Sequence, residues 1–386
     1  MAKRKVYLDH GATTPLRNEV LEEMMPFLTN YFGNPSSVHE FGRETRVSVE
    51  RARQQVAEAI GASSKEIIFT SGGTEADNIA IRGIAQALSS KGKHIITSAI
   101  EHHAVLDTCQ ALEKEGYSVT YLPVDSYGLV DLEKLKSSIT GETILVTIMF
   151  ANNEIGTLQD VARMGKLCRE KGVYFHTDAV QAIGQVEVDV KKQNIDLLSM
   201  AAHKFYGPKG IGALYKRQGV KISPIMFGGG QEKKIRPGTE NVPNIVGMGK
   251  AVELAVGEMK EKTNKMRELR DYLIEGLLSM EGVRLNGHPQ KRLPGNVNVS
   301  IKNTEGEALL LSLDMEGVAA SSGSACTSGS LEPSYVLMAI GLDHETAHGS
   351  LRLTLGKDNT REDINYTLKV LGPIVERIRK ISGSLV

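Results

Sequence analysis

An amine, an imidazole and a carboxylate follow two short apolar runs near the middle of the chain. The run 173–177 leads into Asp178, and the run 195–201 leads into His203 and Lys204. A lysine amine set against a distant carboxylate suits an enzyme that uses pyridoxal phosphate. The lysine binds the cofactor covalently, and the carboxylate keeps the pyridine nitrogen protonated so that the ring can accept electrons. Taken alone, such a pair is more often a plain ion pair or a strand cap.

A second motif, Thr70-Ser-Gly-Gly-Thr-Glu-Ala-Asp77, lies between a predicted strand and a predicted helix. Two glycines and two hydroxyls at the start of a helix can bind a phosphate through backbone N–H groups and the helix dipole. A plain threonine cap with Asp77 three residues further on explains the same residues equally well. The chain has no Walker motif, and Gly210-Ile-Gly212 lacks the third glycine of a dinucleotide site, so nucleotide binding is the weaker alternative.

A metal site is another interpretation of the same region, with ligands drawn from Glu101, His102, His103, His176, Asp178 and His203. Lys204 weighs against it, because a cation stands where further ligands would be expected. An imidazole stacked on a planar cofactor suits His102 or His103 equally well.

Cys326 differs from the other two cysteines. Cys109 and Cys168 lie on amphipathic helical segments, which is typical of small core residues. The neighbours of Cys326 are mainly serine, glycine, alanine and threonine, so this thiol is a poor structural element and a good nucleophile. Arg352 lies within an apolar run, where it could bind a substrate carboxylate or form a structural salt bridge.

The composition describes an ordinary globular protein. The 386 residues are 41% hydrophobic and 24% charged, with 46 basic and 46 acidic residues, so no basic surface argues for nucleic acid. No apolar run approaches a membrane span, and the start of the chain lacks a signal-like apolar segment. Three widely separated cysteines do not form a disulfide framework. We therefore expect a cytoplasmic protein with no membrane and no nucleic-acid partner.

Apolar runs alternate with helical periodicity from residue 66 to residue 201, which predicts a largely parallel sheet covered by helices. The expected strands are 67–69, 94–97, 119–122, 143–150, 173–177 and 195–201. Residues 245–280 are predicted as one long helical stretch, broken only lightly, that connects two domains. A smaller α+β part follows, with strands at 297–301, 318–320 and 350–355 and a final helix at 361–381.

The whole chain resembles the cysteine desulfurases of the NifS/IscS kind, in the class V group of pyridoxal phosphate enzymes. Ten motifs occur in the right order, among them Gly33-Asn-Pro-Ser-Ser37, Asn152-Asn-Glu-Ile-Gly156, His176-x-Asp-Ala-Val-Gln181, Arg236-x-Gly-Thr239 and Ser321-Ser-Gly-Ser-Ala-Cys326. The resemblance implies fold type I, an α/β fold with a large domain built on a mainly parallel, seven-stranded sheet and a smaller α+β domain. The large, cofactor-binding domain would span 15–255. The small domain would combine 1–14 with 256–386 and carry the Cys326 loop.

The resemblance also assigns residues to the cofactor. Lys204 would bind it covalently and Asp178 would contact its pyridine nitrogen. His102 would stack on the ring, Gln181 would bond its phenolic oxygen, and Asn153 would lie beside both ring and substrate.

The phosphate would be held by Gly73, Thr74 and His203, and by Thr239 from a neighbouring subunit, which implies a homodimer. One departure concerns Ala201, because the family usually has a phosphate-binding serine there.

For the substrate, Asn34 and Arg352 would bind the carboxylate, Asn153 would be a further substrate contact, and Cys326 would take the sulfur. The implied reaction converts L-cysteine to L-alanine and leaves a persulfide on Cys326, which passes to an iron–sulfur scaffold or another acceptor protein. No resident metal is implied, although Cys326 could ligate a transferred iron–sulfur cluster. A selenocysteine lyase or a class V aminotransferase is the enzymatic alternative. A sulfur-carrier scaffold is the alternative without catalysis.

Overall fold

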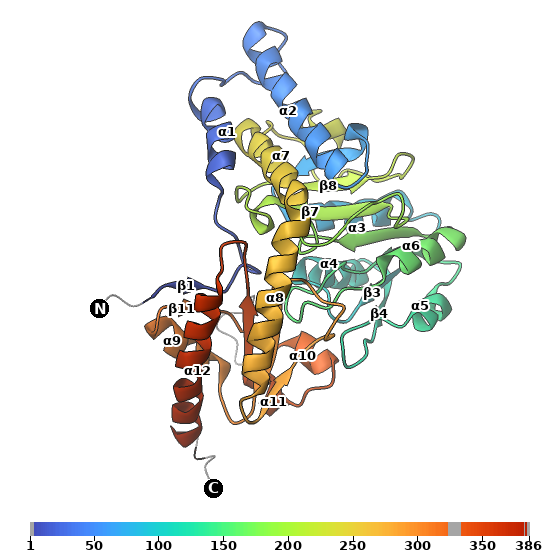
Figure 1. Ribbon diagram of the computed structural model, residues 1–386. Helices are drawn as coiled ribbons and strands as arrows, with labels where there is room; N and C mark the ends of the chain where they lie inside the picture. The colour runs from blue at the N-terminus through green and yellow to red at the C-terminus, as the bar shows by residue number, and fades with distance from the viewer. Residues whose placement is uncertain (1–3, 323–332, 382, 384–386) are drawn as a thin grey trace.

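The computed structural model describes residues 4–322, 333–381 and 383. Seven strands form its central sheet (Figure 1). Their order is β2 (Ile67–Thr70), β8 (Gly212–Lys216), β7 (Leu197–Ala201), β6 (Tyr174–Asp178), β5 (Thr143–Thr147), β3 (His94–Ser98) and β4 (Ser118–Leu122). Only β8 runs antiparallel to its neighbours β2 and β7, and the other pairs are parallel. The predicted fold class is confirmed.

Helices cover both faces of this sheet, because the strands are apolar on both sides. One face packs on α3 (Gly73–Ala87) and α4 (His103–Lys114). The other packs on α2 (Glu40–Ala59), α5 (Leu132–Ser138), α6 (Val161–Glu170) and α7 (Val242–Gly257). Alternate residues of β2 serve the two cores, since Ile68 belongs to the first and Ile67 and Phe69 to the second. Cys109 and Cys168 are fully buried in these cores, as predicted.

The second sheet lies beside the first and is reached through α8 (Met259–Leu278), which descends along the molecule in Figure 1. Its order is β12 (Ser350–Thr354), β10 (Asn296–Ile301) and β9 (Val283–Leu285), all antiparallel. A separate parallel pair joins β1 (Val6–Tyr7) to β11 (Val318–Ala319). Four helices lie among the described residues of this part: α9 (Gly306–Met315), α10 (Tyr335–Ala339), α11 (His344–His348) and α12 (Arg361–Ile381).

The hydrophobic core of this region combines Val6 and Leu8 with residues from 273 to 378. The N-terminal strand therefore packs with the C-terminal half of the chain, although the division at residues 15 and 255 itself stays a prediction. None of the helices described is long and apolar enough to cross a membrane.

The long helical stretch predicted for 245–280, broken only lightly, is present as two helices that meet at Glu258, which ends α7 and precedes α8. One local prediction was wrong. The expected strand 143–150 ends at Thr147, and Met149 instead donates its backbone N–H to the buried carboxylate of Glu101. Ile148 and Phe150 still donate their backbone N–H groups to the oxygens of His176 and Asp178 on β6, so the chain stays beside that strand as it approaches the cavity described below.

Candidate active site

A cavity of about 280 Å³ opens where β5, β6 and β7 end and α3 begins. Parallel strands carry their carboxyl ends to one edge of a sheet, so residues far apart in sequence meet there. The lining residues are Gly11, Ala12, Gly73, Thr74, Asp77, His102, Met149, Ala151, Asn153, Asp178, Val180, Gln181, Ala201, His203, Lys204 and Arg352. Nine of the twelve predicted site residues thus lie on one cavity.

Lys204 follows β7 in a short 3₁₀ turn, Ala202–Lys204. Its Nζ donates to the backbone oxygens of Gly11 and Ala12 at 2.6 and 2.8 Å. Thr14 fixes this N-terminal segment, because its backbone N–H and its hydroxyl both donate to the oxygen of His203. The amine is therefore directed into the cavity by two segments that are nearly 200 positions apart.

Asp178 is the last residue of β6, and only 7% of it is exposed. One carboxylate oxygen accepts the N–H of Val180 at 2.9 Å. Burial raises the pKa of Asp178, while the nearby His102 and Lys204 act in the opposite direction. A buried carboxylate of this kind is stabilised most strongly by a cation brought into the cavity.

His102 caps the first turn of α4, where its Nδ1 accepts the N–H of Ala104 at 3.1 Å. In the neutral ring the proton therefore resides on Nε2. Burial lowers the pKa of His102, so the ring stays neutral below its ordinary titration range. His103 is one-third exposed and contacts Asp107 and Tyr335 instead. The structure thus distinguishes the two histidines that sequence left equivalent.

The start of α3 provides backbone N–H groups for an anion. Its N-cap is Gly72 and has no side-chain cap, so the predicted alternative of a threonine capping box with Asp77 is wrong. A Cβ atom on Gly73 would lie 2.6 Å from the side chain of Val180, so a side chain there would displace part of the cavity wall. Thr74 and His203 line the same end, and Ala201 presents only a methyl group.

Arg352 enters from the second sheet, on β12. It is 3% exposed, donates to the backbone oxygen of Asn153 at 3.1 Å and pairs with Asp9 at 3.2 Å. Both interpretations of Arg352 are therefore compatible with its position, since it is salt-bridged and also lines the cavity. Gln181 donates to the oxygen of Gly11 at 3.0 Å.

Two predicted residues lie elsewhere. Asn34 and Thr239 line a different pocket, between α1 (Asn18–Thr29) and the start of α7. Cys326 lies outside the described residues.

The sequence interpretation missed Asp77, which is 1% exposed and lines the cavity. Its carboxylate lies 3.6 Å from Nε2 of His176, and burial raises the pKa of Asp77. Both nitrogens of His176 are hydrogen bonded to hydroxyls, of Thr147 and Ser199, so this imidazole is not directed toward a ligand. No sequence pattern indicated this role, because only the burial of Asp77 separates it from an ordinary acid at a helix start.

The lining fits a phosphorylated, cationic aromatic cofactor. Within the described part of the chain, three buried polar atoms of this cavity have no hydrogen-bond partner: Oδ1 of Asp77, Oδ1 of Asn153 and Nε of Arg352. Native proteins rarely leave such atoms unsatisfied, so they indicate a polar ligand. The helix start at Gly73 is suited to an anion, and the carboxylates of Asp77 and Asp178 to a cation.

Residues 6–367 match the family described as Aminotransferase class-V. The chain is 58% identical over 381 residues to a protein named cysteine desulfurase IscS from Dictyoglomus turgidum, covering 98% of this chain and 97% of the relative. It is also 58% identical to the protein of that name from Methanosarcina thermophila, with 98% and 94% covered. A solved structure titled NifS-like protein aligns with a TM-score of 0.91 at 40% identity, over 99% of this chain and all of that chain.

Fold, site and relatives agree, and the chain belongs to the class-V aminotransferase family, within its cysteine desulfurase group.

Proposed function

We propose that this protein is a pyridoxal-phosphate-dependent L-cysteine desulfurase that collects the sulfur as a persulfide on Cys326. The observation that carries the proposal is the convergence of Lys204, Asp178, His102 and Arg352 on one cavity. The names of the relatives support the reaction.

Lys204 would bind the cofactor, Asp178 would bond its pyridine nitrogen, and the N–H groups at Gly73 and Thr74 would hold its phosphate, with His203 nearby. His102, Gln181 and Asn153 would contact the ring. When bound, the cofactor supplies an aldehyde that combines with amines and a ring that accepts the electron pair released at the substrate α-carbon. Asp178 would favour that transfer by keeping the nitrogen protonated.

Arg352 would bind the substrate carboxylate through its guanidinium, with Asn153 beside it and Asn34 as a further proposed contact. Lys204 would move the α-proton once its amine has been displaced by the substrate amine. His102, neutral and with its Nε2 able to exchange a proton, would assist the thiol of Cys326. The thiolate sulfur would attack the substrate sulfur, so that a sulfur–sulfur bond forms as the carbon–sulfur bond breaks. The electron pair of the broken carbon–sulfur bond stays with the substrate β-carbon, which takes up a proton, and a proton returns to the α-carbon. Alanine then leaves without any added oxidant.

The proposal includes a homodimer. Several large apolar side chains on or near α1, the N-terminal end of α2 and the 226–240 segment are strongly exposed, among them Phe32, Val38, Phe41, Val47 and Phe227, from 55% to 89%. Such a face is expected to be covered in solution. A second copy is the proposed occupant, because Thr239 lies on the same side of the molecule, in the pocket that Asn34 and Phe32 also line. An iron–sulfur scaffold or another acceptor protein would receive the sulfur, and the cytoplasm is the proposed location.

The test is to supply L-cysteine to the cofactor-loaded protein and to measure alanine together with the mass of Cys326. Wild-type protein should form alanine, and Cys326 should gain the mass of one sulfur atom. Cys326→Ser should retain the cofactor but form neither alanine at the wild-type rate nor persulfide. Transfer of the amino group to an added 2-oxo acid would instead indicate an aminotransferase. Persulfide formation that survives Lys204→Ala would indicate a sulfur carrier.

A further inference from the structure

Three consecutive residues in the segment that carries Thr239 adopt a backbone conformation that side chains disfavour. Glu232, Lys233 and Lys234 have φ angles of 36°, 60° and 62°, and none of them is a glycine. Each left-handed residue of this kind costs free energy, so neighbouring contacts must hold the turn in place.

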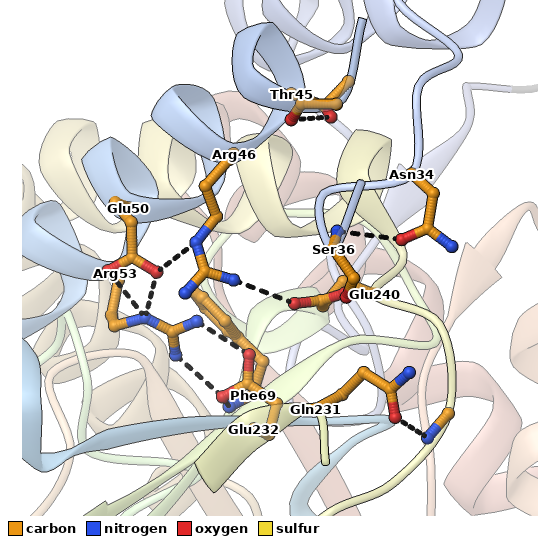
Figure 2. Close-up of polar contacts among 12 residues, drawn as sticks. Asn34, Ser36, Thr45, Arg46, Glu50, Arg53, Phe69, Gln231, Glu232 and Glu240 are labelled. Carbon is orange, nitrogen blue, oxygen red and sulfur yellow. Dashed lines mark hydrogen bonds and ion pairs between the residues drawn. The ribbon is translucent and has the colours of Figure 1, made fainter. Parts of the chain in front are cut away.

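A buried ion pair provides those contacts (Figure 2). The carboxylate of Glu232 accepts a hydrogen bond from each terminal nitrogen of Arg53, both at 2.7 Å. It also accepts one from the backbone N–H of Phe69 at 2.9 Å. Both charged side chains are almost fully buried, with 6% and 3% exposed. Arg53 donates further to the oxygen of Ile67 and lies over the ring of Phe69. The turn is thereby tied to α2 and β2 at once.

The same turn sets the course of the residues that follow. Gln231 accepts the N–H of Gly238 at 3.1 Å and so closes the segment into a loop. The carboxylate of Glu240, directly after Thr239, lies 3.5 Å from the guanidinium of Arg46, which is two turns before Arg53 on the same face of α2 (Figure 2). Arg236 is paired with Glu75 at 3.1 Å. Thr239 itself is exposed and does not line the candidate active-site cavity of its own chain.

We propose that the Arg53–Glu232 ion pair is a positioning device that holds the 231–240 loop in the shape that presents Thr239 to the cofactor phosphate of a second copy of the chain. This inference rests on the proposed function, in particular on a homodimer with Thr239 acting across it. Neither Arg53 nor Glu232 lines the cavity of its own chain, so an effect on the cofactor has to be transmitted through the loop.

Mixed dimers test the inference, because they separate an effect on the partner's site from damage within one chain. Two differently tagged chains are co-expressed and the heterodimer is isolated. In the first heterodimer, Arg53→Met is placed on the chain that also carries Lys204→Ala, opposite a wild-type chain. In the second, Arg53→Met is placed on the chain that keeps Lys204, opposite Lys204→Ala. Borohydride trapping then reports only the cofactor bound to the chain with Lys204.

In the first heterodimer the loop facing the Lys204 site is the altered one, and cofactor should leave that site about ten-fold faster, as expected for one lost phosphate hydrogen bond. In the second, release should match a reference dimer of wild-type and Lys204→Ala chains. Thr239→Ala in place of Arg53→Met should give the same asymmetry. Arg51→Met is the control, because Arg51 is also on α2 but forms an exposed ion pair with Glu23. It should leave the rate of cofactor release unchanged in both heterodimers.

If cofactor leaves faster in the second heterodimer, where Arg53→Met and Lys204 are on the same chain, the variant causes a local structural defect and the inference is overturned. Asymmetric release with Thr239→Ala but not with Arg53→Met would also overturn the inference. That result would leave the proposed function intact. If Arg53→Met does not fold, Glu232→Gln is used in the same design, since it keeps the side-chain volume and weakens the pair. A wild-type protein that is monomeric, or that traps no cofactor on Lys204, would overturn the proposed function and this inference together.

Discussion

The carboxylate of Asp9 lies 3.2 Å from a terminal nitrogen of Arg352, whose Nε has no hydrogen-bond partner within the described residues. Asp9 thus balances part of the buried charge, while one donor stays available at the cavity. A substrate carboxylate that enters would complete the pairing of the guanidinium. Arg352 is therefore preorganised on β12, and Asp9 sets how strongly its charge attracts an anion.

The first prediction replaces Arg352 by lysine. An ammonium group keeps the charge but cannot form the planar, two-pronged contact, so KM for L-cysteine should rise about ten- to a hundred-fold. The cofactor should bind as in the wild type, because Arg352 is not among its proposed contacts. Steady-state kinetics and cofactor absorbance measure the two effects. Arg377→Lys on α12, which alters a contact with Ser312 far from the cavity, is the matched control. An unchanged KM would contradict the assignment.

The second prediction concerns Ala201, where the cavity presents a methyl group beside the helix start. The Cβ of Ala201 lies 3.9 Å from the position that a Cβ on Gly73 would occupy, so a serine hydroxyl has room to reach a phosphate bound there. Ala201→Ser should slow the loss of cofactor during dialysis by about ten-fold, the effect of one charge-assisted hydrogen bond.

Ala202→Ser is the control, because it adds the same hydroxyl to the neighbouring residue, which is fully buried and outside the cavity lining. It should give no gain in retention. Equal retention by wild type and Ala201→Ser would show that another donor already satisfies the phosphate.

The central sheet was predictable because its strands are apolar on both faces and are separated by helical periodicity. The strand β8 was not predicted, since its five residues follow a turn rich in glycine and run antiparallel. A light break in the stretch 245–280 was predicted, but its position at Glu258 was not visible, because glutamate is a good helix former. The helices α10 and α11 have five residues each, too few for periodicity to appear.

Most of the site could be predicted from residues that follow strands, because parallel strands bring their ends together. Asp77 was not predicted as a site residue, because its spacing also fits a capping acid at a helix start. Only its burial distinguishes a cavity-lining carboxylate from such a cap. Asn34 and Thr239 form a pocket of their own in the single chain, so their proposed roles depend on contacts with a second chain. The contacts of Arg53 with Glu232 join positions 179 residues apart, and no local pattern indicates such a pair.

The third prediction concerns thiol reactivity in the native protein. Burial raises the pKa of Cys109 and of Cys168 to about 12, so both remain protonated as well as inaccessible at neutral pH. Brief treatment with iodoacetamide should therefore modify Cys326 alone, and peptide mass mapping identifies the site. In urea all three thiols should react. Rapid native labelling of Cys109 or Cys168 would contradict their placement in the core.

The last prediction concerns stability in acid. His176 is fully buried between the hydroxyls of Thr147 and Ser199, and burial lowers its pKa from 6.5 to about 3. In the unfolded chain the ring takes up a proton as the pH falls through 6.5, whereas the folded protein resists until about pH 3. Between these values the unfolded state binds more protons, so this group makes folding less stable as the pH falls.

The loss amounts to about 1.4 kcal/mol per pH unit, or about 2 kcal/mol between pH 6.5 and 5. His176→Gln retains a donor and an acceptor for the two hydroxyls but cannot titrate. Urea unfolding of the variant should therefore show a free energy of unfolding that declines less over this range than that of the wild type, by about 2 kcal/mol. His344→Gln changes an exposed ring on α11 and should keep the wild-type pH dependence. Parallel pH profiles for wild type and His176→Gln would show that His176 takes up its proton as readily in the folded protein as in the unfolded chain, which would contradict the burial of its ring.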